Sequence, residues 1–182
     1  MRIFLGIDIP DTITSKIDEQ LANLKKEYPQ LSWVPQDNYH ITIHFFGEVP
    51  DVTAVDKRLA ELLYDQEAFH LYALQGDLFI QQRITLYIEF SKDKKLEHLA
   101  KIINEDAGKE RSAKKFLPHM TIARYKVPSK QQYYLLKKKM EHLQLDFDFP
   151  VESIYLYESD LRGPMPVYKK IKEYPLYTPK TK

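Results

Sequence analysis

The chain has 182 residues and a formal net charge of +1, with 43% hydrophobic and 29% charged residues. These values are typical of a globular protein with a proper core, and the small charge excludes a protein that coats nucleic acid by neutralising many phosphates. The chain has no cysteine, which excludes disulfides, zinc–thiolate sites and cysteine nucleophiles. We expect a cytoplasmic protein without a signal peptide or a membrane span.

The expected elements alternate between β-rich and amphipathic segments. β-branched and aromatic runs predict strands, and apolar residues at helical spacing predict helices. In chain order they are a strand at 3–9, a helix from about 11 that ends at Tyr28-Pro29, an extended segment at 33–35, a strand at 39–46, a helix at about 51–64, strands near 69–74, 78–81 and 83–90, a helix at about 94–109, a strand at 119–125, a helix at 129 to about 142, and strands near 147–157 and 167–175.

The order contains a repeat. The tetrapeptide His40-Ile41-Thr42-Ile43 recurs 79 residues later, from 40 to 119, as His119-Met120-Thr121-Ile122, and Val49-Pro50 recurs as Val127-Pro128. Two copies are too few for a solenoid. We therefore predict an α+β fold made of a bilobal, pseudo-symmetric duplicated unit, with two antiparallel sheets flanking a central cleft and helices on the outer faces. The whole chain, 1–182, is expected to form this single domain, with an internal repeat of about 33–90 and 112–175.

The repeated motif places an imidazole beside a hydroxyl. Alternate residues of a strand share one face, so His40 with Thr42, and His119 with Thr121, are expected to line the cleft while their apolar neighbours enter the core. Two histidines can supply the base and the acid that hydrolysis of a cyclic phosphodiester requires. Threonine hydroxyls can donate hydrogen bonds to the phosphoryl oxygens. The motifs do not tell which histidine is the base and which is the acid.

His44 falls on the same predicted strand face as His40 and Thr42, so we expect it at the mouth of the cleft as a further substrate contact. A metal shared by His40 and His44 is not expected, because four residues of strand separate them by roughly 13 Å. No metal and no other cofactor is therefore predicted.

Nearly the whole chain resembles the two-histidine phosphoesterase superfamily, in its branch of RNA 2',3'-cyclic phosphodiesterases, also described as RNA 2'-5' ligases. The resemblance is carried by the opening strand at 2–10, by the segments 33–35 and 38–49 around the first motif, by 116–124 around the second, and by Leu156–Ser159, Gly163-Pro164 and Tyr168.

This resemblance implies a bilobal enzyme that hydrolyses a terminal 2',3'-cyclic phosphate on RNA to a 2'-phosphate. It implies catalytic roles for His40 and His119, phosphate-binding roles for Thr42 and Thr121, a phosphate contact for Arg124, and base stacking for Phe45. Strict strand alternation points Arg124 and Phe45 away from the cleft, so a strand end or a bulge must re-aim them.

Other functions remain open at this point. Enzymes that cut or join 2'-5' linkages, or that open a cyclic phosphate on a small nucleotide, would use the same histidine pair, and a non-catalytic module that binds RNA ends is an alternative of another class. The expected partner is an RNA 3' end or a nucleotide with a cyclic phosphate, with no membrane involved, and we expect a monomer.

Overall fold

The computed structural model describes residues 1–107, 116–126, 129–163 and 165–179, which form an α+β fold. The helices are α1 (Asp11–Glu27), α2 (Val52–Leu63), α3 (Lys94–Asp106) and α4 (Lys130–Glu141), with a short 3-10 helix, η1 (Gln36–Asn38). The strands are β1 (Arg2–Asp8), β2 (Ser32–Trp33), β3 (His40–Glu48), β4 (Phe69–Ile80), β5 (Ile84–Phe90), β6 (His119–Tyr125), β7 (Asp148–Val151), β8 (Ser153–Asp160) and β9 (Val167–Pro175).

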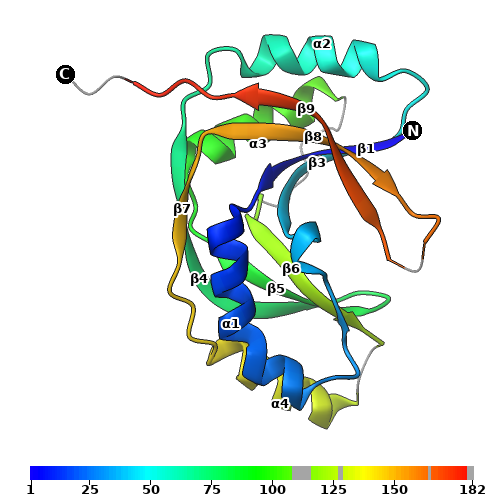
Figure 1. Ribbon diagram of the computed structural model, residues 1–182, viewed down its shortest axis with the longest axis vertical. Helices are drawn as coiled ribbons and strands as arrows, with labels where there is room; N and C mark the ends of the chain where they lie inside the picture. Colours follow the sequence, from blue (N-terminus) through cyan, green and yellow to red (C-terminus); the bar gives the residue numbers. More distant parts are fainter. Residues whose placement is uncertain (108–115, 127–128, 164, 180–182) are drawn as a thin grey trace.

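The strand order of the described residues is symmetric about its centre. It runs β7-β4-β5-β6-β3-β1-β8-β9, and β2 pairs with β6. If β1 is exchanged with β5, β3 with β6 and β4 with β8, the same order results when it is read from the other end. Only the edge strands β7 and β9 differ. At the centre of this order β3 pairs with β6, through Ile41 and Met120. The two expected sheets are thus joined into one antiparallel sheet at a narrow junction (Figure 1).

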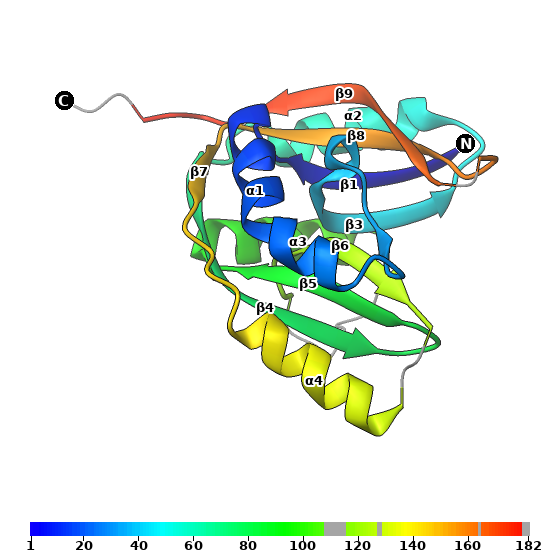
Figure 2. The same cartoon turned by 60° about the horizontal axis from the view of Figure 1, so that its bottom comes forward.

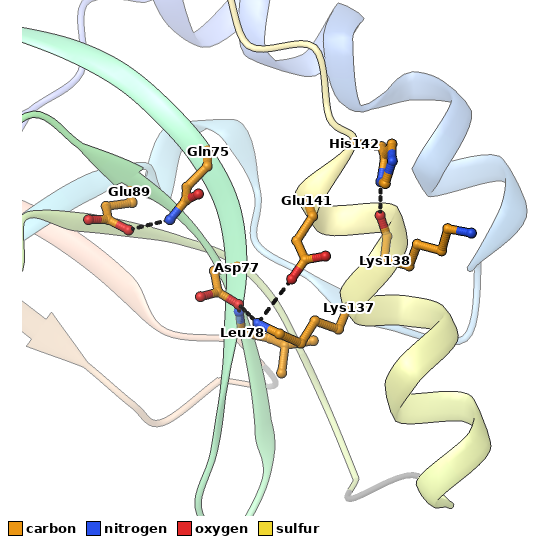
Figure 3. A network of polar contacts seen from close by, with 8 residues as sticks. All are labelled: Gln75, Asp77, Leu78, Glu89, Lys137, Lys138, Glu141 and His142. Carbon is orange, nitrogen blue, oxygen red and sulfur yellow. Dashed lines mark hydrogen bonds and ion pairs between the residues drawn. The ribbon is translucent and has the colours of Figure 1, made fainter.

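Two helices accompany each half of the sheet. Helices α2 and α3 contact one another beside β3 and β9, whereas α4 packs on β4 (Figures 1 and 2). Lys139 of α4 pairs with Glu27 of α1 at 2.9 Å. Polar residues begin three of these helices: Asp51 and Asp93 accept backbone N–H groups, and Ser129 forms a capping box with Gln132. Lys137 of α4 binds Asp77 of β4 at 2.8 Å, which ties this helix to the sheet (Figure 3).

Two expected strand boundaries are wrong. The segments predicted at 69–74 and 78–81 form one strand, β4, because its first part pairs with β7 and the rest pairs with β5. Gly76 lets α4 approach this strand closely; a Cβ there would lie 2.8 Å from the carbonyl oxygen of Met140. The segment predicted at 147–157 is divided into β7 and β8 at Glu152.

Several predictions fall partly outside the described residues. The predictions that lie there concern the end of the third helix at 109, the start of the second repeat at 112–115, the repeated Val127-Pro128, and Pro164. In the part of the chain that is described, no helix is long and apolar enough to cross a membrane.

Candidate functional site

The two His-x-Thr motifs lie side by side at the junction of the half-sheets. His40 and Thr42 are half-buried on β3, and His119 and Thr121 are half-buried on β6. The intervening residues face the two cores: Ile41, Ile43, Met120 and Ile122 are all at most 5% exposed. The alternation predicted for both motifs is confirmed, and pairing of β3 with β6 brings the two polar faces together.

Both imidazoles are fixed in the same tautomer. Nδ1 of His40 lies 2.7 Å from the carbonyl oxygen of Asn38, and Nδ1 of His119 lies 2.8 Å from that of Leu117. A carbonyl oxygen can only accept a hydrogen bond, so Nδ1 carries the hydrogen in each ring. Nε2 is therefore the atom that can exchange a proton with a substrate.

Aromatic rings hold each histidine in place. His40 packs against Phe4, with 4.8 Å between ring centroids, and meets Tyr168 edge-on at 4.9 Å; Phe4 is itself stacked on Tyr157. Rings packed in this way restrict the rotamer of the imidazole.

The other half repeats this packing with different residues. His119 meets Phe79 and Tyr87 edge-on, and these two rings are stacked on one another at 4.1 Å. That these aromatic rings contact the histidines was not predicted from the sequence. They come from neighbouring strands whose pairing no local motif reveals.

Burial holds the pKa of His40 well below its usual range, at about 4. The hydrogen bond to Asn38 opposes this shift, the positive charge of Arg124 and the neighbouring His119 add to it, and the negative charge of Asp8 opposes it. His40 is therefore neutral at pH 7, and its Nε2 can accept a proton.

Two equivalent bulges turn Phe45 and Arg124 out of strict alternation. On β3 the pairing with β1 skips from Thr42 to His44, and on β6 the pairing with β5 skips from Thr121 to Ala123. Phe45 is consequently 40% exposed, and its ring lies 5.2 Å from Phe4, the ring that also touches His40. The expected bulge is confirmed in both strands.

Arg124 lies at the corresponding place in the second half. It lines one small pocket together with His40, Thr121 and Tyr168. Of the predicted residues, the fold thus gathers both histidines, both threonines, Arg124 and Phe45 about the junction of β3 and β6.

His44 does not join them, and its expected position at the mouth of the cleft is wrong. The bulge on β3 turns His44 to the face that carries Ile43, where it is 3% exposed. Its Nδ1 lies 2.7 Å from Oδ1 of Asn104 on α3, and it lines a cavity of about 340 Å³ beside α2 and α3. Simple alternation fails here because the bulge inserts one residue.

A second, larger groove adjoins His40. It has a volume of about 550 Å³ and is lined by β9, η1 and the start of α1, including Asp8, Tyr157, Tyr168 and Lys170. Within the described ranges, no three His, Asp or Glu side chains cluster as a metal site would require.

Comparison with known proteins identifies the family. The sequence model of the 2'-5' RNA ligase superfamily matches residues 13–163. The chain belongs to the 2'-5' RNA ligase superfamily. The matched residues include both His-x-Thr motifs, one in each half of the sheet.

Several known proteins align with nearly the full chain. An RNA 2',3'-cyclic phosphodiesterase of Thermotoga maritima is 27% identical, over 95% of this chain and 94% of that protein. One of Methanocaldococcus jannaschii is 28% identical, over 96% of this chain and 100% of that protein. The crystal structure of E. coli LigT complexed with 3'-AMP superposes with a TM-score of 0.66 at 23% identity, over 96% of each chain, which confirms the fold.

Proposed function

We propose that this protein hydrolyses a terminal 2',3'-cyclic phosphate on RNA to a 2'-phosphate, without a metal. The observation that carries the proposal is the pair of anchored imidazoles, His40 and His119, which stand on adjacent strands with Nδ1 fixed and Nε2 available. Membership of the 2'-5' RNA ligase superfamily supports it, as do the names of the relatives from T. maritima and M. jannaschii.

In this mechanism His40 is the general base. Because the lowered pKa keeps its imidazole neutral, Nε2 takes a proton from water as the water oxygen attacks phosphorus. His119 then donates a proton from Nε2 to the departing 3' oxygen of the ribose. One P–O bond forms and one breaks, which leaves a 2'-phosphate and a free 3'-hydroxyl.

The remaining residues bind the substrate. We assign Thr42, Thr121 and Arg124 to the non-bridging phosphoryl oxygens, where hydrogen bonds and positive charge stabilise the developing negative charge. Phe45 offers an exposed ring for stacking by the terminal base. We leave His44 out of the substrate site, because it is buried against Asn104 on the other face.

The organisation of the chain is part of the proposal. A single bilobal domain over 1–182 with an internal duplication is supported by the symmetric strand order, although that order suggests a unit that begins at β1 rather than at residue 33. A monomeric, cytoplasmic protein remains our prediction.

A substrate panel tests the proposed activity. Purified protein is incubated with an RNA that ends in a 2',3'-cyclic phosphate, a 2'-5'-linked dinucleotide and a small cyclic nucleotide. We expect fastest turnover of the RNA, with a 2'-phosphate as product. Faster turnover of either other substrate would assign the site to a different phosphodiester, and binding without turnover would indicate a module that only binds RNA ends.

A further inference from the structure

Each motif histidine has a carboxylate as its direct cross-strand partner. Asp8 of β1 pairs with His40 of β3, and Glu89 of β5 pairs with His119 of β6. Directly opposed residues of an antiparallel pair project to the same face, with their Cβ atoms about 4.5–5.5 Å apart. The duplicated fold therefore places one acid beside each imidazole.

The two carboxylates differ in their hydrogen-bond partners. Asp8 accepts hydrogen bonds from Nζ of Lys170 at 2.6 Å and from the hydroxyl of Tyr157 at 3.1 Å. Glu89 accepts one from the neutral amide of Gln75 at 2.9 Å (Figure 3). The acid beside His40 is thus ion-paired, whereas this bond leaves the charge of Glu89 intact.

The influence of this ion pair on the protonation of His40 depends on the other groups around the ring. The titratable and charged groups that face it are Asp8 of β1, His119 and Arg124 of β6, Tyr157 of β8, and Tyr168 and Lys170 of β9. Lys169, Asp11 and Asp37 line the adjoining groove. Among the charges that act on His40, Asp8 is the one that favours the protonated ring, and it opposes the effects of burial and of Arg124.

We propose that Asp8 and Lys170 form a positioning pair that tunes how readily His40 takes up a proton. Lys170 compensates the charge of Asp8 and so limits how far Asp8 favours the protonated ring, while Asp8 partly offsets the effect of Arg124. This inference rests on the proposed function only where His40 is taken to be the general base. The electrostatic coupling between His40, Asp8 and Lys170 does not depend on turnover.

The pair is poorly suited to a purely structural role. The side chains of Lys170 and Asp8 are 47% and 31% exposed, and ion pairs at such positions contribute little to stability. Substitution of either residue should therefore leave the fold intact. Its effect should be visible in the titration of the imidazole beside it.

NMR titration of the His40 ring tests the inference directly, in the wild type, Asp8→Asn, Lys170→Gln and the double variant. We expect the midpoint to rise by roughly half a pH unit or more in Lys170→Gln, where Asp8 is uncompensated, and to fall in Asp8→Asn. In the double variant, the effect of removing Lys170 should shrink to less than half, because it acts mainly through Asp8.

Lys172→Gln is the matched control. Lys172 lies on the same strand, is 51% exposed and pairs with Asp56 at 3.3 Å, so its loss should leave the His40 midpoint unchanged. Shifts in the same direction for Asp8→Asn and Lys170→Gln, or no shift in Lys170→Gln, would overturn the inference. Because the ring is observed without substrate, this failure is distinct from an absence of phosphodiesterase activity.

Discussion

Phe45 and Arg124 occupy equivalent positions in the two halves of the fold, each three residues after the threonine of a His-x-Thr motif. A bulge precedes each of them, at Ile43 on β3 and at Ile122 on β6. The duplication thus supplies one position that the two halves use differently: an aromatic ring in one and a guanidinium in the other. This division fits the proposed substrate, a terminal nucleotide that presents both a base and a cyclic phosphate.

Arg124 should matter for phosphate stabilisation. Replacement by Gln removes the positive charge from the pocket that it shares with His40 and Thr121, and we expect kcat/KM to fall by roughly a hundredfold. Steady-state kinetics on a cyclic-phosphate RNA measure this. Arg58→Gln is a suitable control, because Arg58 pairs with Asp106 and Glu61 on the helical side. A fall of less than threefold in kcat/KM for Arg124→Gln would show that Arg124 does not stabilise the phosphate.

Phe45 should matter for binding of the base. We expect Phe45→Ala to raise KM about tenfold with little change in kcat, because loss of base stacking costs about 1–3 kcal/mol. Phe45→Tyr keeps the ring and should stay close to the wild type. Equal losses in both variants would instead point to disturbed packing against Phe4.

The low pKa of His40 predicts a dependence of stability on pH. The unfolded chain binds a proton at this residue near pH 6.5, whereas the folded protein does so only near pH 4. Between these values the unfolded state holds more protons, so the free energy of unfolding falls as the pH is lowered from 6.5 towards 4.

Urea denaturation at pH 7 and pH 4.5 measures this effect in the wild type and in His40→Gln. We expect the wild type to lose about 2 kcal/mol more than the variant over this range. An equal loss in both proteins would show that His40 is not held neutral by the fold.

Gly6 should be required for the pairing of β1 with β3 next to Thr42. A Cβ at this position would lie 2.9 Å from the carbonyl oxygen of Ile41, so Gly6→Ala must push the two strands apart. We expect a loss of about 1–3 kcal/mol in the free energy of unfolding, together with reduced activity. Gly163→Ala, whose nearest neighbour would lie at 3.4 Å, should be well tolerated; thermal denaturation compares the two.

The sequence predicted the centre of the site because its signals are local. The spacing within each His-x-Thr motif fixes which side chains share a strand face, and the recurrence of the motif indicates a pair of similar strands. The pairing of β3 with β6 then brings the motifs together. The helices were also predictable, since their apolar spacing, and the N-terminal caps of α2, α3 and α4, lie within single segments.

Features that depend on pairing between distant strands were not predictable from one sequence. His44 was placed on the wrong face because the position of a bulge depends on the partner strand β1. Phe79, Tyr87 and Tyr157 could not be connected with the histidines for the same reason. The pairing of Asp8 with His40 likewise joins segments that no motif relates.

The central claim is tested most directly by hydrolysis of a short RNA that ends in a 2',3'-cyclic phosphate. The rate is measured in EDTA for the wild type, His40→Ala and His119→Ala. Our account predicts that the wild type forms a 2'-phosphate and that each variant loses at least about a hundredfold in rate. Wild-type activity that EDTA abolishes, or a variant that retains most of the rate, would contradict a metal-independent mechanism based on the two histidines.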